Sequence, residues 1–510
     1  MILLIVLTIL IIFIFNEFFW KRRPYPPGPM PLPIVGNMNE IAKIEPGYDA
    51  FLKWRDIYGP VYTVWLGVEP VVVVADYPTI KDSFIRDGEV FQDKLKFEMY
   101  TDLFRDGQYG VMDVSGDVWR NHRRFAITQL RHLGLGKSVM EEKILLEVQE
   151  MIKSIDQNGP IVPNTQKVFD VAVGSIINQL LFSERFDDSR VEEMLTLRGL
   201  IQDQMRWFGD PTFYLITTFP KLRFLPYFKS VYAEVFKLRD TVFGKLQKQI
   251  DEHTKVIKTR SGYEEAVDYV EAYLREQQKR EESGDVDTFS DKQLLNMCWD
   301  LWVAGLETVA NTLAWLSIYL INHPHVQKKL YAELDRVIAS DRLIAMSDKN
   351  LLPYTNAVIN EAQRLANLLP INLIHTVNKD YKIGDHVIPS GTGVIAQIST
   401  VLYDEKLREA WNYSVHHFVF QVFPNHMEFI PERFLDEDGN IKKVDELIPF
   451  SVGKRQCLGE GLAKMELFLF VANLFNHFSI EKNDECPSME KTFSMTVAAK
   501  KFSCKLVRRK

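Results

Sequence analysis

The sequence predicts a mainly α protein with a small β region, formed as one large domain behind an N-terminal membrane anchor. The chain has 510 residues, of which 46% are hydrophobic, so it can bury a large core. No Gly/Ser linker, low-complexity tract or internal repeat divides it, which favours a single unit. Helical patterns dominate its length, and β-branched runs are short. Together these observations predict the fold class.

Net charge and cysteine content narrow the classes of function. The formal net charge is −7, which argues against a nucleic-acid partner. The four cysteines, Cys298, Cys457, Cys486 and Cys504, form no CxxC pair and no disulfide framework. A reducing, cytosol-facing location fits this pattern.

The N-terminus predicts an uncleaved membrane anchor over residues 1–20. This stretch is almost entirely apolar, and Lys21-Arg22-Arg23 follows it directly. A cleaved signal peptide, which is the alternative, carries its charge in front and a small-residue cleavage site behind. Positive charge after the apolar run places the rest of the chain in the cytosol. We therefore expect the membrane to be a partner of this protein.

A hinge and a strand pair follow the anchor. Residues 21–33 are basic and proline-rich, and proline fixes the backbone dihedrals, so this segment is expected to be a stiff spacer. Residues 34–510 then form the predicted catalytic domain. Within it, residues 61–67 and 70–75 are rich in β-branched side chains and predict a hairpin.

The most informative stretch lies near the C-terminus and centres on Cys457. An apolar helical run follows this cysteine, and a helix N-terminus favours a thiolate over a thiol. Gly459 allows a flat ligand to approach the backbone, and Arg455 offers a forked cation to a carboxylate. A thiolate with these neighbours suits an axial ligand to haem iron. The alternative is a buried structural cysteine.

The spacing Phe-x-x-Gly-x-Arg-x-Cys-x-Gly is complete at Phe450, Gly453, Arg455, Cys457 and Gly459. It resembles the haem-thiolate signature of the cytochrome P-450 monooxygenases, and the resemblance is strongest to the animal microsomal members that metabolise drugs and fatty acids. It implies haem b (iron protoporphyrin IX) as the cofactor and Cys457 as the iron ligand. Phe450, Arg455 and Gly459 would surround the cofactor.

A long helix is predicted from Asp291 to Asn322. Ser290 and Gln293 form a capping-box pattern at its start, and His323-Pro324 follows its end. Its length would be about 48 Å, and its middle is apolar on every side, so it should run through the interior.

Polar residues interrupt this helix at Ala304-Gly305-Leu306-Glu307-Thr308. A buried carboxylate is costly unless it is paired or functional. The structural alternative is that Thr308 bonds back to a helix carbonyl and Glu307 finds a cation. The stretch resembles the family's oxygen-activation motif A-G-x-[DE]-T. The resemblance implies that Ala304 and Gly305 leave room beside the cofactor and that Glu307 and Thr308 deliver protons.

Further motifs of the family concern the haem propionates. Trp119 and Arg123 lie four residues apart on one predicted helix face and match W-x-x-x-R, whose members bond a propionate. The position of His375 implies another propionate partner. Arg105 is shifted from the position of a further propionate arginine and is left out. Exposed arginines near Trp119 could receive an acidic electron donor: Arg120, Arg124 and Arg131.

Glu361 and Arg364 match the family's E-x-x-R, and Arg433 lies in the later P-E-R-F motif. We expect these three residues to form a structural ion-pair triad rather than to take part in chemistry.

Two segments allow more than one interpretation. Residues 207–228 are dense in aromatics and prolines and suit core, substrate roof or a second membrane contact. Residues 407–421 are inserted into an otherwise continuous resemblance, as either a surface loop or a retained intron. Their apolar content favours the intron. The adjacent His416-His417 pair lacks the further ligands of a metal site.

The sequence thus predicts a haem-dependent monooxygenase that inserts one oxygen atom of O2 into a lipophilic small molecule, namely a xenobiotic, a fatty acid or a steroid. No Gly-rich flavin or nicotinamide motif is present, so electrons are expected from a separate NADPH–cytochrome reductase, with cytochrome b5 as a second donor. The endoplasmic reticulum membrane is the expected location, with the catalytic domain facing the cytosol. The alternatives are an isomerase or dehydratase of the same fold, a non-catalytic haem-binding protein, or the inactive product of a mis-spliced gene.

Overall fold

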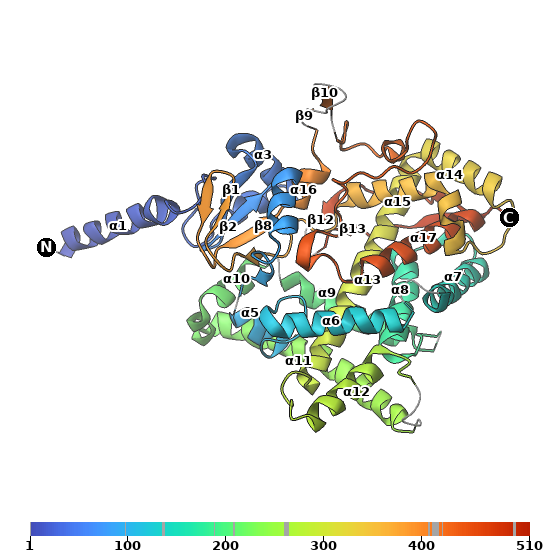
Figure 1. Cartoon of the computed structure of the whole chain (residues 1–510), viewed down its shortest axis with the longest axis horizontal. Helices are drawn as coiled ribbons and strands as arrows, with labels where there is room; N and C mark the ends of the chain where they lie inside the picture. The colour runs from blue at the N-terminus through green and yellow to red at the C-terminus, as the bar shows by residue number, and fades with distance from the viewer. Residues whose placement is uncertain are drawn as a thin grey trace. The chain divides into compact units, whose positions relative to one another are not determined.

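The computed structural model describes residues 2–96, 98–134, 138–187, 189–207, 210–259, 265–405, 408–410, 418–420, 422–492 and 496–510. The chain divides into two compact units, each described here by itself. The first unit comprises residues 1–96, 369–426 and 445–457, and the second comprises residues 97–368, 427–444 and 458–510. Figure 1 traces the elements along the chain.

The first unit is formed around a five-stranded sheet of order β1-β2-β8-β5-β3. The predicted hairpin is confirmed, because β1 and β2 pair antiparallel, whereas β2 and β8 pair parallel. The first unit contains strands β1 (Val61–Leu66), β2 (Glu69–Val74), β3 (Asp93–Lys94), β5 (His375–Thr376), β6 (Tyr381–Ile383), β7 (His386–Ile388) and β8 (Gly393–Ala396). Of these, β6 and β7 pair in a separate two-stranded sheet. Its helices are α1 (Ile2–Phe18), η1 (Trp20–Arg22), α2 (Met38–Ala42), α3 (Tyr48–Tyr58), α4 (Tyr77–Ile80), η2 (Lys81–Arg86), α16 (Ile398–Leu402) and η7 (Gly453–Arg455).

The second unit is mainly helical, which confirms the predicted fold class. Its helices are α5 (Glu98–Arg105), α6 (Gly116–His132), α7 (Ser138–Asn158), α8 (Thr165–Phe182), α9 (Val191–Arg206), α10 (Pro211–Thr218), η4 (Pro220–Phe224), α11 (Pro226–Ile257), α12 (Tyr269–Glu282), α13 (Asp291–Asn322), α14 (Pro324–Val337), η5 (Met346–Leu351), α15 (Pro353–Ala366), η6 (Pro431–Phe434) and α17 (Glu460–His477). Its short strands are β4 (Ile161–Val162), β11 (Phe478–Lys482), β12 (Lys491–Thr492), β13 (Ala498–Ala499) and β14 (Cys504–Arg508).

Helix α13 has the predicted bounds, and most of its residues are buried. The Ser290 side chain caps it by accepting a hydrogen bond from Gln293 N at 3.3 Å. The predicted reciprocal bond, from the Gln293 side chain back to the Ser290 backbone, is wrong. The Gln293 carboxamide instead bonds both backbone groups of Gly110, at 2.9 and 3.0 Å, and so fixes the loop before α6 to α13.

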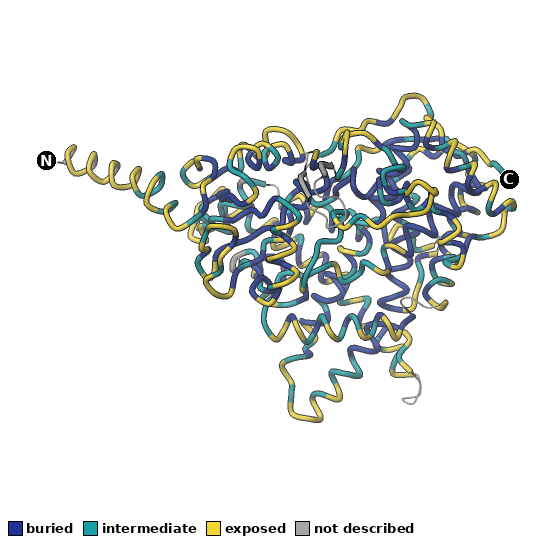
Figure 2. The backbone as a smooth tube through the Cα atoms, turned by 45° about the horizontal axis from the view of Figure 1, so that its top comes forward, coloured by how far each residue is buried: buried dark blue, intermediate teal, exposed yellow. Residues whose placement is uncertain are grey.

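Helix α1 is the exposed N-terminal helix in Figure 2. The stretch Leu3–Arg22 has 20 residues, a mean hydropathy of 2.5 and no buried share, so it has the length and composition to cross a membrane. Helix α13 meets the same criteria of length and composition but is 72% buried, so it is a core helix. These properties agree with an anchor at the N-terminus.

Helix α5 was not expected, because the sequence from Phe91 to Gly116 lacks clear periodicity. Leu103 and Phe104 of this helix pack with Phe213 and Ile216 of α10 in one buried cluster. Part of the aromatic segment 207–228 is therefore core. Trp207, Leu222 and Phe228 pack partly buried against this cluster, whereas Phe224 and Tyr227 are exposed. Residues 208 and 209 lie outside the described residues.

The inserted segment 407–421 is described only in part. Strands β9 (Arg408–Ala410) and β10 (Phe418–Phe420) pair antiparallel. Residues 407, 411–417 and 421 lie outside the described residues, and these include Trp411, Tyr413 and the His416-His417 pair. The origin of the insertion stays a prediction.

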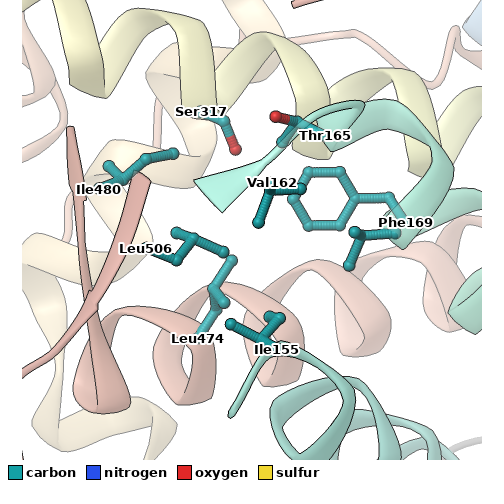
Figure 3. A pocket seen from close by; sticks show the side chains of 9 residues that line it. Ile155, Val162, Thr165, Phe169, Ser317, Leu474, Ile480 and Leu506 are labelled. Carbon is teal, nitrogen blue, oxygen red and sulfur yellow. The ribbon is translucent and has the colours of Figure 1, made fainter. Parts of the chain in front are cut away.

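A small apolar cavity lies in the core of the second unit (Figure 3). Side chains from α8, α13, α17 and β14 line it, including Phe169, Ser317, Leu474 and Leu506. Its volume is about 10 Å³, which holds at most one water molecule. This cavity is a packing space and cannot admit a substrate.

The predicted ion-pair triad is confirmed as a buried cluster. Arg364 donates two hydrogen bonds to Glu361, at 2.7 and 2.9 Å, and Arg433 Nε donates a third at 3.0 Å. Glu361 Oε1 also accepts Ile430 N at 2.9 Å. Glu361 and Arg364 are fully buried, so the cluster ties α15 to the segment around η6.

Removing the carboxylate of this triad should destabilise the protein strongly. Glu361→Gln leaves two arginines without their anion, which costs about 3–5 kcal/mol for a buried pair. Urea unfolding measures the loss. The control Asp203→Asn breaks the exposed Arg206–Asp203 pair and should change stability little. Equal stability of Glu361→Gln and wild type would contradict the structural role.

Candidate haem site

The loop before Cys457 is closed by backbone hydrogen bonds. Cys457 N donates to Phe450 O at 3.0 Å, and Gln456 N donates to Gly453 O at 3.1 Å. Gly453 has a φ of +79°, and a Cβ at this position would overlap Phe84 O, so only glycine fits. The thiol of Cys457 is exposed at the end of this loop. Helix α17 begins at Glu460 with Gly459 as its N-cap, so the cysteine precedes a helix N-terminus closely, as predicted.

Two of the other cysteines are unsuited to metal ligation. Cys298 is fully buried, and burial raises the pKa of its thiol far above the ordinary value. Cys504 is also fully buried, and burial raises the pKa of its thiol to about 11. Thr165 Oγ1 lies 3.2 Å from the sulfur of Cys504, as a donor in a hydrogen bond. A thiol that stays protonated is a poor ligand, because the thiolate is the form that binds metals.

Three basic side chains gather beside this loop in the first unit. Arg455 Nε donates to Gln92 O at 2.6 Å, and His375 Nδ1 donates to Phe91 O at 2.6 Å. Lys94 lies directly opposite His375 in the β3–β5 ladder. Burial lowers the pKa of His375 well below its usual range, and the positive charges of Lys94 and Arg455 lower it further. Lys94 and Arg455 thus both lie close enough to His375 to disfavour its protonated form.

Sequence reasoning missed Lys94. Its side chain is 6% exposed, and its Nζ donates to Leu373 O at 3.1 Å. The family resemblance points to an arginine before Trp119, and Lys94 lies in a two-residue strand that has no clear pattern of its own. Lys94 could have been placed beside His375 only if the pairing of β3 with β5 had been known.

Arg105, which the sequence analysis did not assign to the propionates, is fully buried and forms ion pairs with Asp113 and with Asp300 of α13. Its guanidinium also lies 4.5 Å above the ring of Trp299. Its charge is thereby neutralised within the protein.

Trp119 and Arg123 share one face of α6, as predicted. The Arg123 guanidinium carbon lies 6.0 Å from the centre of the Trp119 ring. Trp119 is buried and Arg123 is half-buried. Arg120, Arg124 and Arg131 are exposed along the same helix, although Arg120 pairs with Asp117 at 2.7 Å.

Residues 304–308 of α13, which match the oxygen-activation motif, form an accessible stretch of a buried helix. Ala304 is exposed, and Gly305, Glu307 and Thr308 are half-buried, whereas every residue from Val309 to Leu320 is buried. Thr308 Oγ1 donates to Ala304 O at 2.8 Å, the bond that the structural alternative expects. Glu307 Oε1 accepts a hydrogen bond from Asn311 Nδ2 at 3.3 Å, so this partner is an amide rather than a cation.

The residues present fit haem in their chemistry. In the first unit, the loop gives an exposed cysteine, and Lys94, His375 and Arg455 give basic groups for carboxylates. In the second unit, Ala304 gives a small exposed side chain on α13, whereas the missing Cβ of Gly305 makes room for Ile177 of α8. Trp119 with Arg123 gives further donors. Phe450 is half-buried in the first unit, and Gly459 lies at the start of α17 in the second.

Comparison with known proteins identifies the class. The sequence model of the cytochrome P450 family matches residues 26–506. Cytochrome P450 2C7 of Rattus norvegicus is 33% identical over 461 residues, which cover 90% of this chain and 89% of the relative. Cytochrome P450 2C4 of Oryctolagus cuniculus is 32% identical, over 91% of this chain and 90% of the relative. Cytochrome P450 2C8 of Homo sapiens is 31% identical, over 92% of this chain and 91% of the relative.

Fold and site therefore define a haem-dependent oxidoreductase. The chain belongs to the cytochrome P450 family. It is a monooxygenase with haem b as its cofactor.

The two glycines that flank Cys457 should respond differently to alanine. Gly453→Ala places Cβ against Phe84 O at a positive φ, so we expect a lower melting temperature of the apoprotein and poor haem loading. A Cβ added at Gly459 would have no atom within 4 Å, so the apoprotein of Gly459→Ala should keep its stability while its haem affinity falls. Differential scanning fluorimetry and haem titration measure the two effects. An apoprotein of Gly453→Ala as stable as wild type would contradict this account.

Proposed function

We propose that this protein inserts one oxygen atom of O2 into a lipophilic small molecule, with Cys457 as the thiolate ligand of the haem iron. The observation that carries the proposal is the accessible Ala304–Thr308 stretch within the otherwise buried α13. A helix that serves only the core has no need of a glycine, a carboxylate and a hydroxyl in its middle. When bound, haem supplies the iron at which O2 is activated.

The proposed roles of the remaining residues follow from their chemistry. Ala304, Phe450 and Gly459 give the flat macrocycle close access to the protein, while Gly305 lets α13 approach α8 closely behind Ala304. Trp119, Arg123, His375 and Arg455 hold the two propionates, and Lys94 joins them as a further cation. His375 uses its Nδ1–H on Phe91 O, so it can donate to a propionate only after Nε2 takes up a proton. A propionate beside it favours that protonation, because it offsets the repulsion by Lys94 and Arg455.

Glu307 and Thr308 move protons in this proposal. The Thr308 hydroxyl donates to Ala304 O, and rotation about its Cβ–Oγ1 bond would free this O–H to pass on a proton. Glu307 is half-buried and is positioned by the Asn311 amide, whose Nδ2 also donates to Thr496 Oγ1 at 3.1 Å. A positioned acid and alcohol on one helix turn are suited to general acid catalysis.

Electron supply and location complete the proposal. The exposed Arg124 and Arg131 of α6 suit docking of an acidic NADPH–cytochrome reductase, with cytochrome b5 as a second donor. The apolar helix α1, followed by the basic residues 21–23, suits an anchor in the endoplasmic reticulum with the catalytic domain in the cytosol. Xenobiotics, fatty acids and steroids are the proposed substrate class.

Cys457→Ser tests the iron ligand. The variant should lose the red-shifted Soret band that a thiolate gives to the ferrous–CO complex, because a serine hydroxyl stays protonated. Cys504→Ser, at a buried thiol with a raised pKa, is the matched control and should keep the band. A thiolate-type spectrum in Cys457→Ser, or its loss in Cys504→Ser alone, would overturn the assignment.

Thr308→Ala tests proton delivery. Haem loading and substrate binding should stay intact, while product per NADPH falls by about an order of magnitude and hydrogen peroxide rises in its place. Thr312→Ala is the control, because Thr312 Oγ1 makes the same kind of helix bond, to Thr308 O at 2.8 Å, but lies in the buried part of α13. Wild-type coupling in Thr308→Ala would count against its role.

A further inference from the structure

His375 and Lys94 lie directly opposite each other in the antiparallel pairing of β3 with β5. His375 Nδ1 donates to Phe91 O at 2.6 Å, just before β3, and Lys94 Nζ donates to Leu373 O at 3.1 Å, just before β5. Each side chain is thus bonded to the segment that leads into the other strand. Both residues are 6% exposed, so these bonds hold two basic groups together in the interior of the first unit.

Arg455 is bonded to the same segment. Its Nε donates to Gln92 O at 2.6 Å, and Gln92 directly follows Phe91, which accepts the His375 bond. A carbonyl oxygen is a neutral acceptor, so these bonds position the basic side chains without adding a negative charge beside them.

The charges that act on His375 are those of Lys94 and Arg455, and both are positive. Of the described residues packed against β5, those of β8 have no titratable side chain. Helix η2 contributes the ring of Phe84, whose centroid lies 5.2 Å from that of the imidazole. Asp93 directly precedes Lys94, so its side chain lies on the opposite face of β3.

The imidazole of His375 can meet an anion only with its second nitrogen. A carbonyl oxygen can only accept, so Nδ1 carries the hydrogen of the bond to Phe91 O. In the neutral ring Nε2 is then an acceptor, and its lone pair repels a carboxylate. A proton at Nε2 makes it a donor and gives the ring a positive charge. Burial and the two cations keep the pKa of His375 well below its usual range, so the ring is neutral until an anion arrives.

We propose that His375 takes up one proton from solvent at Nε2 when haem is loaded. One N–H bond forms, no bond of the cofactor breaks, and the ring gains its positive charge beside a propionate. Haem affinity should therefore fall as the pH rises between the pKa of His375 in the apoprotein and its higher pKa in the loaded protein. This inference rests on the proposed function and adds the proton balance of cofactor loading.

Isothermal titration calorimetry in buffers of different ionisation enthalpy counts the protons. Metal-free protoporphyrin IX is titrated into the full-chain apoprotein, because it carries both propionates but cannot bind the Cys457 thiol, which releases a proton to iron. A propionate should return the pKa of His375 at least to its ordinary value of about 6.5, so at least about half a proton should be taken up at that pH. The dimethyl ester of the porphyrin lacks the carboxylates and should cause no uptake. Equal uptake with the acid and the ester would overturn the proposal.

His375→Gln is the matched variant. Its amide can donate to a carboxylate without taking up a proton, so it should bind the porphyrin with no uptake. His386→Gln, at a half-buried histidine in β7, is the control and should keep the uptake of wild type. Uptake of the wild-type size in His375→Gln contradicts the assignment of the proton.

The haem-loaded full chain gives an independent measurement. Loss of the His375 proton breaks a charge-assisted bond, so transfer of haem to apomyoglobin should become about tenfold faster as the pH rises from about 6 to about 9. The rate in His375→Gln should not rise over this range. An equal rise in wild type and His375→Gln would count against the coupling.

The coupling and the proposed function fail in different ways. Cys457→Ser should take up as many protons from metal-free porphyrin binding as wild type, because the cysteine has no part in the uptake. No uptake in wild type, together with a thiolate-type spectrum that depends on Cys457, would overturn the coupling alone. Uptake that depends on His375, together with a thiolate-type spectrum in Cys457→Ser, would support the coupling and overturn the iron ligand.

Discussion

The close approach of α13 to α8 at Gly305 is the constraint on which the interior of the second unit depends. Glycine in a helix costs about 1 kcal/mol relative to alanine, yet any Cβ here would overlap Ile177. The contact fixes the rotation of a 32-residue helix about its axis. That rotation leaves Ala304 exposed and Glu307 and Thr308 half-buried, on the side of α13 that faces away from Ile177. The missing Cβ of Gly305 thus sets which side of the motif is accessible.

The buried charges fall into two kinds with different consequences. Glu361 with Arg364, and Asp300 with Arg105, are opposite charges that neutralise each other and hold segments together. Lys94 and Arg455 are instead two cations that lie near His375. Burial lowers the pKa of His375 well below its usual range, and these two positive charges lower it further. A bound anion would offset their repulsion of protonated His375. This contrast separates the structural ion pairs from the proposed propionate partners.

Long, strongly patterned elements could be predicted from the sequence, and short or register-dependent ones could not. The bounds of α13 follow from Ser290, an apolar interior and Pro324, and the β1–β2 hairpin follows from its valines. Helix α5 is only 8 residues long, too short for a clear period, and its packing on Phe213 is a tertiary contact. The local capping pattern predicted that the Gln293 side chain bonds the start of its own helix, whereas it bonds Gly110, which is far away in sequence. Lys94 comes beside His375 through the pairing of β3 with β5, which no local pattern encodes.

Ligation of iron by Cys457 is the central claim, and X-ray absorption at the iron edge tests it most directly. The sample is the haem-loaded full chain in which Cys457 is the only cysteine, made by the substitutions Cys298→Ser, Cys486→Ser and Cys504→Ser. The account predicts one sulfur atom in the first coordination shell of the iron, besides the porphyrin nitrogens. A first shell of nitrogen and oxygen atoms alone in the folded, haem-loaded protein would contradict it.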